Sequence, residues 1–362
     1  NIASDLINSG TLISQGESDL NATTLRNSGK IMANRLGLQG TSLNNDGLLQ
    51  GNTALTAQAD NITQSAGGKT LSGGTLTLTA GQLNTQGTLQ GEQATVNADN
   101  WLHQGSLLGS KDLNASISNE LHNTGSLMSQ NTAQVTANTL NNSGSLLSEG
   151  AMTLNGAALN NSGSVQGKTL TISPASVINQ GSLIGLQALT FAAAPQVAGR
   201  MLLRALAAPS RQLINNQGGS LLTQGTLNIN GGDVVNNGSW QGQQILLNAR
   251  QLTNNGAIQS ADALQLILAD RLDAGAGSKI SANGTAALQA LTLTNQGEWI
   301  ARNLTLRGDT LNNNGAVTGV DALTVGLNGA LTQQQDKTLL SAGRLTLQSS
   351  SLNNAGRVQG GD

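Results

Sequence analysis

The sequence predicts an all-β fold, a right-handed parallel β-helix of about eighteen coils of about 20 residues each. Three observations support this prediction. A short motif with Leu, Asn and Gly at fixed positions recurs along almost the whole chain. Apolar residues alternate with polar ones inside each copy of the motif. Aromatic residues make up only 1% of the 362 residues, whereas the cores of ordinary globular proteins depend on them for much of their buried area.

The repeat unit is Leu-x-Asn-x-Gly-x-Leu, followed by a polar step and a second apolar pair. One clear copy runs from Leu140 through Asn142 and Gly144 to Leu146. Apart from the step from Val177 to Ile214, successive copies begin 18 to 21 residues apart. We assign the coil starts to Leu6, Leu25, Leu43, Ile62, Leu83, Trp101, Leu121, Leu140, Leu159, Val177, Ile214, Val234, Leu252, Leu272, Leu293, Leu311, Leu331 and Leu352.

The alternation within each unit is the period of a strand with one buried face. A helix would need apolar residues three and four apart, and the recurring glycine would penalise it. We therefore expect two or three short strands per coil, joined at corners where Asn and Gly accept tight backbone conformations. Parallel pairing between coils then satisfies the backbone and stacks the inward aliphatic side chains.

The asparagine of the motif is predicted to form a row along the interior. Side-chain amides that occupy the same position in neighbouring coils can hydrogen-bond to each other, as they do in cross-β stacks. The predicted row consists of Asn8, Asn27, Asn45, Asn123, Asn142, Asn161, Asn179, Asn216, Asn236, Asn254, Asn295, Asn313 and Asn354.

Composition excludes several functional classes. The net charge is −2 and the isoelectric point is near 5.7, so bulk charge gives no attraction to nucleic acid or to an anionic membrane. The absence of cysteine from the sequence excludes disulfides and thiolate metal sites. No apolar run reaches the length of about 18 residues that a membrane span needs.

The run from Leu140 to Leu146 and its other copies resembles the haemagglutinin repeats of two-partner-secretion exoproteins. That group includes filamentous haemagglutinin adhesins and contact-dependent growth inhibition proteins. The resemblance implies export through an outer-membrane secretion transporter and folding outside the cell as a β-helical stalk that serves adhesion or toxin delivery. The chain opens within a repeat, so we expect it to be a segment of a longer polypeptide whose export signals lie elsewhere.

The repeat divides the chain into residues 1–191, a non-repeat excursion at 192–212, and repeats again at 213–362, which we expect to form one continuous solenoid. Pro195 and Pro209 bracket the excursion. Between them lies a segment with helical propensity, and insertions into solenoids often form a binding face.

The excursion lies in a stretch of the chain with an excess of positive charge. No Asp or Glu occurs from residue 151 to 232, whereas basic residues do. One interpretation is a contact site for a target-cell receptor or glycan, and the other is a short helix that only covers a distorted coil. The candidate contact residues are Arg200, Met201, Arg204, Leu206 and Arg211.

An enzyme is the rival class, because parallel β-helices also carry polysaccharide-cleaving sites that need clustered carboxylates. Neighbouring coils do not place acids at matching positions. Asp270 and Asp273 are close in sequence but flank an inward leucine, and we expect them to serve in turns. His103 takes a position of the asparagine row, and His122 lies in the next coil. We therefore expect no catalytic site, no metal and no cofactor.

The three tryptophans occupy repeat positions that are otherwise aliphatic. Trp101 stands at a coil start, and Trp240 and Trp299 take the position that Ile31 holds in its own coil. We interpret all three as core residues and expect a structural stalk of a secreted surface filament, with a receptor-binding module as the alternative.

Overall fold

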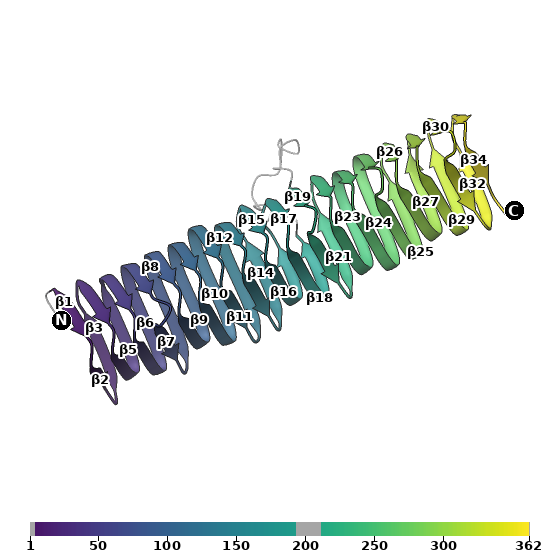
Figure 1. Cartoon of the computed structure of the whole chain (residues 1–362). Helices are drawn as coiled ribbons and strands as arrows, with labels where there is room; N and C mark the ends of the chain where they lie inside the picture. The colour runs from purple at the N-terminus through teal and green to yellow at the C-terminus, as the bar shows by residue number, and fades with distance from the viewer. Residues whose placement is uncertain (1–3, 193–210, 362) are drawn as a thin grey trace, which may run out of the picture. The chain divides into compact units, whose positions relative to one another are not determined.

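The computed structural model describes residues 4–192 and 211–361, and its only regular elements there are β-strands. The chain forms two compact units, Asn1–Pro174 and Ala175–Asp362, and each is a stack of parallel coils (Figure 1). Within residues 4–192 and 211–361 the two units together contain 34 strands in about 18 coils. The predicted all-β parallel solenoid is confirmed.

Sixteen strands build the first unit, several of which run through a corner into the next face of the coil. They are β1 (Asp5–Asn8), β2 (Thr11–Ile13), β3 (Glu17–Asn21), β4 (Thr24–Asn27), β5 (Lys30–Asn45), β6 (Leu48–Gln64), β7 (Lys69–Ser72), β8 (Thr75–Thr85), β9 (Thr88–His103), β10 (Ser106–Asn123), β11 (Ser126–Ser129), β12 (Thr132–Asn142), β13 (Ser145–Ser148), β14 (Ala151–Asn155), β15 (Ala158–Asn161) and β16 (Ser164–Ile172).

Eighteen strands build the described part of the second unit in the same manner. They are β17 (Ser176–Asn179), β18 (Ser182–Phe191), β19 (Gln212–Asn215), β20 (Ser220–Thr223), β21 (Thr226–Asn230), β22 (Asp233–Asn236), β23 (Ser239–Asn254), β24 (Ala257–Ala274), β25 (Lys279–Gln289), β26 (Thr292–Asn295), β27 (Glu298–Gly308), β28 (Thr310–Asn313), β29 (Ala316–Leu327), β30 (Ala330–Gln333), β31 (Thr338–Ser341), β32 (Arg344–Gln348), β33 (Ser351–Asn354) and β34 (Arg357–Gln359).

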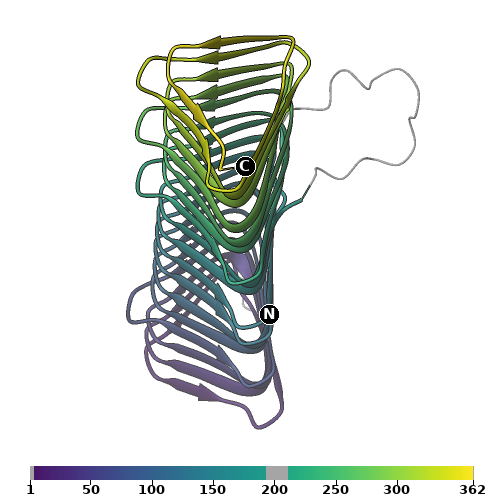
Figure 2. The same cartoon turned by 90° about the vertical axis from the view of Figure 1, so that its right-hand side faces the viewer.

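Each coil has three strand faces, which overlie those of its neighbours in the same unit (Figure 2). In the coil that starts at Leu140, the first face is the end of β12, the second is β13 and the third is β14. Each strand pairs in parallel with its equivalent in the next coil, so that Leu121, Leu140 and Leu159 are partners across β10, β12 and β15. This register places identical positions of the repeat one above another.

The core of each unit consists of the inward members of the alternating pattern. In the Leu140 coil these are Leu140, Leu146, Met152 and Leu154, all of which are buried. Burial of an aliphatic side chain of this size contributes about 1.5–3 kcal/mol. Because each side chain also contacts its equivalents in neighbouring coils, the core of each unit is a column rather than a cluster.

The three tryptophans lie in this core. Trp101, Trp240 and Trp299 are all fully buried. Trp240 pairs in register with Leu221 and Ile258, and Trp299 pairs with Ile280 and Val317. They fill aliphatic positions of the column, as the sequence pattern predicted.

One predicted coil start is wrong by a single residue. Leu213, not Ile214, pairs with Val177 and with Val234, and Leu213 is buried while Ile214 faces outward. The motif Ile214-x-Asn216-x-Gly218 fits the repeat in sequence. However, the corner after β19 contains extra residues and turns through Gly218 at φ 84°. A shift of one residue reverses the direction of every side chain in a strand.

The corner glycine of the motif is required by the close approach of successive coils. A Cβ atom added to Gly144 would overlap the carbonyl oxygen of Gly125 in the preceding coil. The same overlap with the preceding corner would occur at Gly163. The backbone cannot move away without breaking the parallel ladder, so glycine is retained here for space.

We predict that Gly144→Ala destabilises the protein by about 1–3 kcal/mol, since the new methyl group forces neighbouring corners apart. The measurement is the midpoint of thermal unfolding followed by circular dichroism. Gly16→Ala is the matched control, because no atom lies within 4 Å of a Cβ at that position. Equal midpoints for the two variants would contradict the steric explanation.

Candidate functional site

A row of buried side-chain amides runs through the first unit. Asn8 Nδ2 donates to Asn27 Oδ1 at 2.8 Å, and Asn27 Nδ2 donates to Asn45 Oδ1 at 2.9 Å. Farther along, Asn123 Nδ2 donates to Asn142 Oδ1 at 2.7 Å, and Asn142 Nδ2 donates to Asn161 Oδ1 at 2.7 Å. The donors also bond backbone carbonyl groups at the corners; Asn142 Nδ2, for example, reaches Ser164 O at 3.3 Å. The row therefore holds the corners together and uses its polar groups internally.

The second unit has the same row with two departures from asparagine, Ala274 and Gln333. Asn179 Nδ2 donates to Asn215 Oδ1 at 2.8 Å, and Asn215 Nδ2 donates to Asn236 Oδ1 at 2.9 Å. The row continues to Asn254 and is interrupted at Ala274. It resumes at Asn295, whose Nδ2 donates to Asn313 Oδ1 at 2.9 Å, and Asn313 Nδ2 donates to Gln333 Oε1 at 2.7 Å.

Two predicted members of the row differ from the prediction. Asn216 lies in the corner beside the row, where its backbone N–H donates to Asn179 O at 2.8 Å, and Asn215 takes the buried place. This is the one-residue shift described above. Asn354 is in register with Gln333 but is exposed, because it lies in the last described coil.

Between Asn45 and Asn123 the row is replaced by a different hydrogen-bond network. The Trp101 indole Nε1 donates to Thr85 Oγ1 at 2.9 Å, and Thr85 Oγ1 lies 2.8 Å from His103 Nδ1. His103 Nε2 lies 3.1 Å from Ser126 O. A backbone carbonyl only accepts, so Nε2 carries the proton and Nδ1 accepts from the Thr85 hydroxyl. His103 is thereby fixed as a neutral imidazole.

Burial controls the charge of His103. Desolvation lowers the pKa of His103 from 6.5 to about 4, although its hydrogen bond to Ser126 acts in the opposite direction. The ring also leaves Asn123 Oδ1 without a hydrogen-bond partner among the described residues. An asparagine at position 103 would supply the side-chain N–H donor that Asn123 Oδ1 lacks.

The predicted partner-contact residues Arg200, Met201, Arg204 and Leu206 lie outside the described residues. Arg211 is described and exposes only 5% of its surface, and desolvation lowers the pKa of its guanidinium group. This burial leaves little of Arg211 for contact with an external partner.

Acidic and histidine side chains do not converge in the part of the chain that the structure describes. No three of them are placed to hold a metal ion there. Asp270 lies 3.7 Å from Arg250, and Asp273 lies 3.2 Å from Arg271, so both are in ion pairs with arginine. His122 is exposed on the outside of β10.

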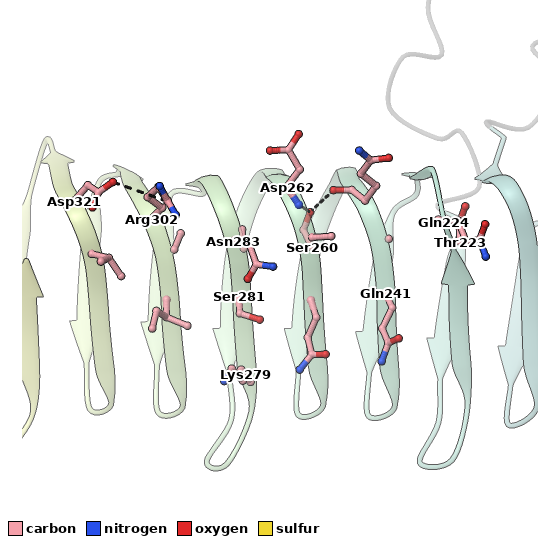
Figure 3. Close-up of a pocket in the computed structure, with 18 residues that line it drawn as sticks. Thr223, Gln224, Gln241, Ser260, Asp262, Lys279, Ser281, Asn283, Arg302 and Asp321 are labelled. Carbon is pink, nitrogen blue, oxygen red and sulfur yellow. Dashed lines mark hydrogen bonds and ion pairs between the residues drawn. The ribbon is translucent and has the colours of Figure 1, made fainter.

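A groove of about 1060 Å³ lies on the surface of the second unit (Figure 3). It follows the outward face of the second strand in successive coils and the corner that leads to the third strand. The side chains that line the groove come from β20, β23, β24, β25, β27 and β29 and from the corners that follow these second-face segments. They include Thr223, Gln224, Gln241, Gln259, Ser260, Asp262, Lys279, Ser281, Asn283, Ile300, Arg302, Val320 and Asp321.

The register of the sheet determines the order of these side chains. Gln241, Gln259, Ser281 and Ile300 are successive partners across β23, β24, β25 and β27. Beside them runs a column of small residues that begins at Gly242. Ser260 is held in this column, since its Oγ lies within hydrogen-bonding distance of Gln243 O (2.8 Å) and Ala263 O (2.7 Å).

The charges of the groove balance. Lys279 Nζ lies 3.3 Å from Glu298, and Arg302 Nε lies 3.9 Å from Asp321. Asp262 and Asp321 offset Lys279 and Arg302 among the lining residues. The amides of Gln241 and Gln259 form no hydrogen bond with other described side chains. The groove is therefore lined by polar and apolar side chains together, its charges are balanced, and it is open to a ligand.

A second groove of about 760 Å³ lies on the third-strand face of the same unit. It contains the exposed apolar side chains Ile267 and Leu291, together with Arg307 and Asp309. Among the described residues, no helix has the length and apolar character needed to cross a lipid bilayer.

Comparison with known proteins identifies the repeat. The model of the haemagglutinin repeat matches residues 1–38, 33–125, 93–156 and 109–194, which together cover more than half of the chain. The chain belongs to the haemagglutinin repeat family. The predicted resemblance is confirmed, and no solved structure matches the chain.

Curated relatives of this haemagglutinin repeat chain are much longer proteins. It is 45% identical to a tRNA nuclease CdiA of Escherichia coli strain NC101 over 92% of the chain. It is 42% identical to a 16S rRNA endonuclease CdiA of Enterobacter cloacae over 97%, and 43% identical to a Toxin CdiA of Escherichia coli over 98%. In each case the chain spans about 10% of the relative's length.

The groove is the feature that sequence reasoning missed. The repeat motif describes inward residues and corners, whereas the groove consists of outward residues that vary from coil to coil. One signal was available: the outward position of the second strand carries Gln241 and Gln259 in adjacent coils.

We predict that Asn142→Ala destabilises the first unit by about 1–3 kcal/mol for each buried polar group that loses its partner. Asn123 Nδ2 loses its side-chain acceptor in this variant. Asn141→Ala is the control, because the bonds of Asn141 to Glu120 and Asn160 are exposed. Denaturant unfolding measures both variants, and an equal loss in the control would refute a special role of the buried row.

We predict an acid-dependent loss of stability from His103. Its pKa is lower in the folded state than in the unfolded state, so the unfolded state binds more protons between these values. The contribution of buried, neutral His103 to the free energy of unfolding is fully present above pH 6.5. It falls by roughly 3 kcal/mol as the pH is lowered toward 4. His103→Asn should remove this component from the pH dependence of unfolding, whereas His122→Asn should retain it.

Proposed function

We propose that this chain is a structural stalk segment of a secreted bacterial surface filament that presents adhesive or toxin-delivery parts to a target cell. The observation that carries the proposal is the coil-to-coil register of each unit. Backbone pairing, the aliphatic column and most of the amide row join each coil to the next, so each coil supports its neighbours within the stack.

Family membership and relative length support the same role. The matched model is a repeat, and the relatives named as nucleases or toxins are about ten times longer than the chain. We assign the activities in those names to parts of the relatives outside the matched segment. An outer-membrane secretion transporter and a surface location follow from the family as parts of this proposal.

A stalk segment acts through its length and register, and this can be tested by deletion in the full-length parent protein. Deletion of residues 121–158 removes two whole coils and joins Glu120 to Leu159, the register equivalent of Leu140. We expect surface display and target-cell binding or killing to persist, with the filament shorter by about 10 Å.

The matched control removes residues 121–149, which joins strands out of register. We expect this variant to lose surface display, since the junction joins the first face of one coil to β14, a third-face strand, and so interrupts the parallel ladder there. Two results would count against the stalk: loss of target-cell binding with normal display after the two-coil deletion, or normal display after the out-of-register deletion.

A further inference from the structure

From the groove of the second unit we infer a binding site for a linear, uncharged polysaccharide chain that lies along the stacking axis of that unit. The inference concerns a ligand of this segment itself and does not depend on its role as a stalk. It rests on the dimensions of the groove, its hydrogen-bonding groups and its balance of charge.

The dimensions of the groove fit an extended chain. Its lining residues come from six successive coils, from Thr223 to Asp321. At about 4.8 Å per coil this gives a length of about 24 Å. A hexose in an extended polysaccharide advances by about the same distance as one coil. Successive sugars would therefore meet equivalent positions in successive coils.

The side chains along the groove suit sugar hydroxyl groups. Gln241 and Gln259 are adjacent register partners, and each amide offers both a donor and an acceptor. Ser281 and Asn283 continue the polar lining in the next coil (Figure 3). Val320, which is 44% exposed, gives an apolar surface near one end for the C–H face of a ring.

Other classes of ligand fit less well. A peptide strand needs an unpaired sheet edge, but β23 pairs with β20 on one side and with β24 on the other. An amphipathic helix needs a continuous apolar stripe, whereas the large apolar side chains of the lining, Ile300 and Val320, lie toward one end and the remainder carries amides, hydroxyls and charged groups. A polyanion needs excess positive charge, and Asp262 and Asp321 offset the two cations.

The groove would bind a glycan without cleaving it. Hydrolysis of a glycosidic bond requires two carboxyl groups about 5–9.5 Å apart. Asp262 and Asp321 lie in β24 and β29 and are three coils apart, which is about 14 Å. Asp321 is also paired with Arg302.

The test is a titration of the 362-residue chain with neutral linear hexasaccharides, namely maltohexaose, isomaltohexaose and β-1,4-mannohexaose, and with delipidated neutral O-polysaccharides. Saturation-transfer NMR detects binding and calorimetry measures affinity. We expect at least one probe to bind, with at least a tenfold gain in affinity from its disaccharide to its hexasaccharide. A heparin hexasaccharide should not bind.

Two pairs of substitutions locate the site. Gln241→Ala with Gln259→Ala removes exposed groove amides and should weaken binding at least tenfold, while circular dichroism stays unchanged. Gln244→Ala with Gln265→Ala removes exposed amides of the same strands outside the groove and should leave affinity within twofold. Ser281→Trp, which fills the groove from an outward position, should abolish binding.

Three outcomes would overturn the inference. They are no binding of any neutral probe at millimolar concentration, binding of the heparin probe alone, and binding that survives both the paired Gln241 and Gln259 substitutions and Ser281→Trp. A failure of the two-coil deletion experiment would leave this result unaffected, because that deletion lies in the first unit.

Discussion

Parallel backbone pairing between successive coils is the constraint on which every other feature depends. It fixes the separation of equivalent residues at about 4.8 Å. At that separation a corner such as Gly144 has no room for a side chain, whereas an asparagine two residues earlier is close enough to bond its equivalent. The same separation orders the outward side chains of the groove. Core, corners and surface of each unit therefore follow from one geometric requirement.

The inward-facing side chains and the corners could be predicted from the sequence, because the same residue types recur at the same positions of each repeat. Strand alternation, corner glycines and buried tryptophans each depend on a position within the unit, and the unit recurs many times. The prediction failed at Asn216, where a longer corner allows two adjacent asparagines to fit the motif and only packing selects Asn215. The local motif carries no information on how many residues a corner contains.

The arrangement of the outward-facing side chains could not be predicted in the same way. The groove depends on which outward residues become neighbours across coils, and this requires the register of each strand and not only its pattern. The network of Thr85, Trp101 and His103 is a similar case. Each residue looks like an isolated departure from the repeat. Together they form one connected network, because Thr85 Oγ1 accepts from the Trp101 indole and also bonds His103 Nδ1.

The buried amide row also has a direction. In Asn27, Asn142 and Asn236 alike, the nitrogen donates to the later coil and the oxygen accepts from the earlier one. A stack that grows from its N-terminal end therefore offers a free donor at its growing edge wherever the last coil carries one of these asparagines, and the incoming coil must bring an acceptor. Such an edge acts as a template that discriminates against inverted or out-of-phase addition, which gives assembly of the stack an intrinsic polarity.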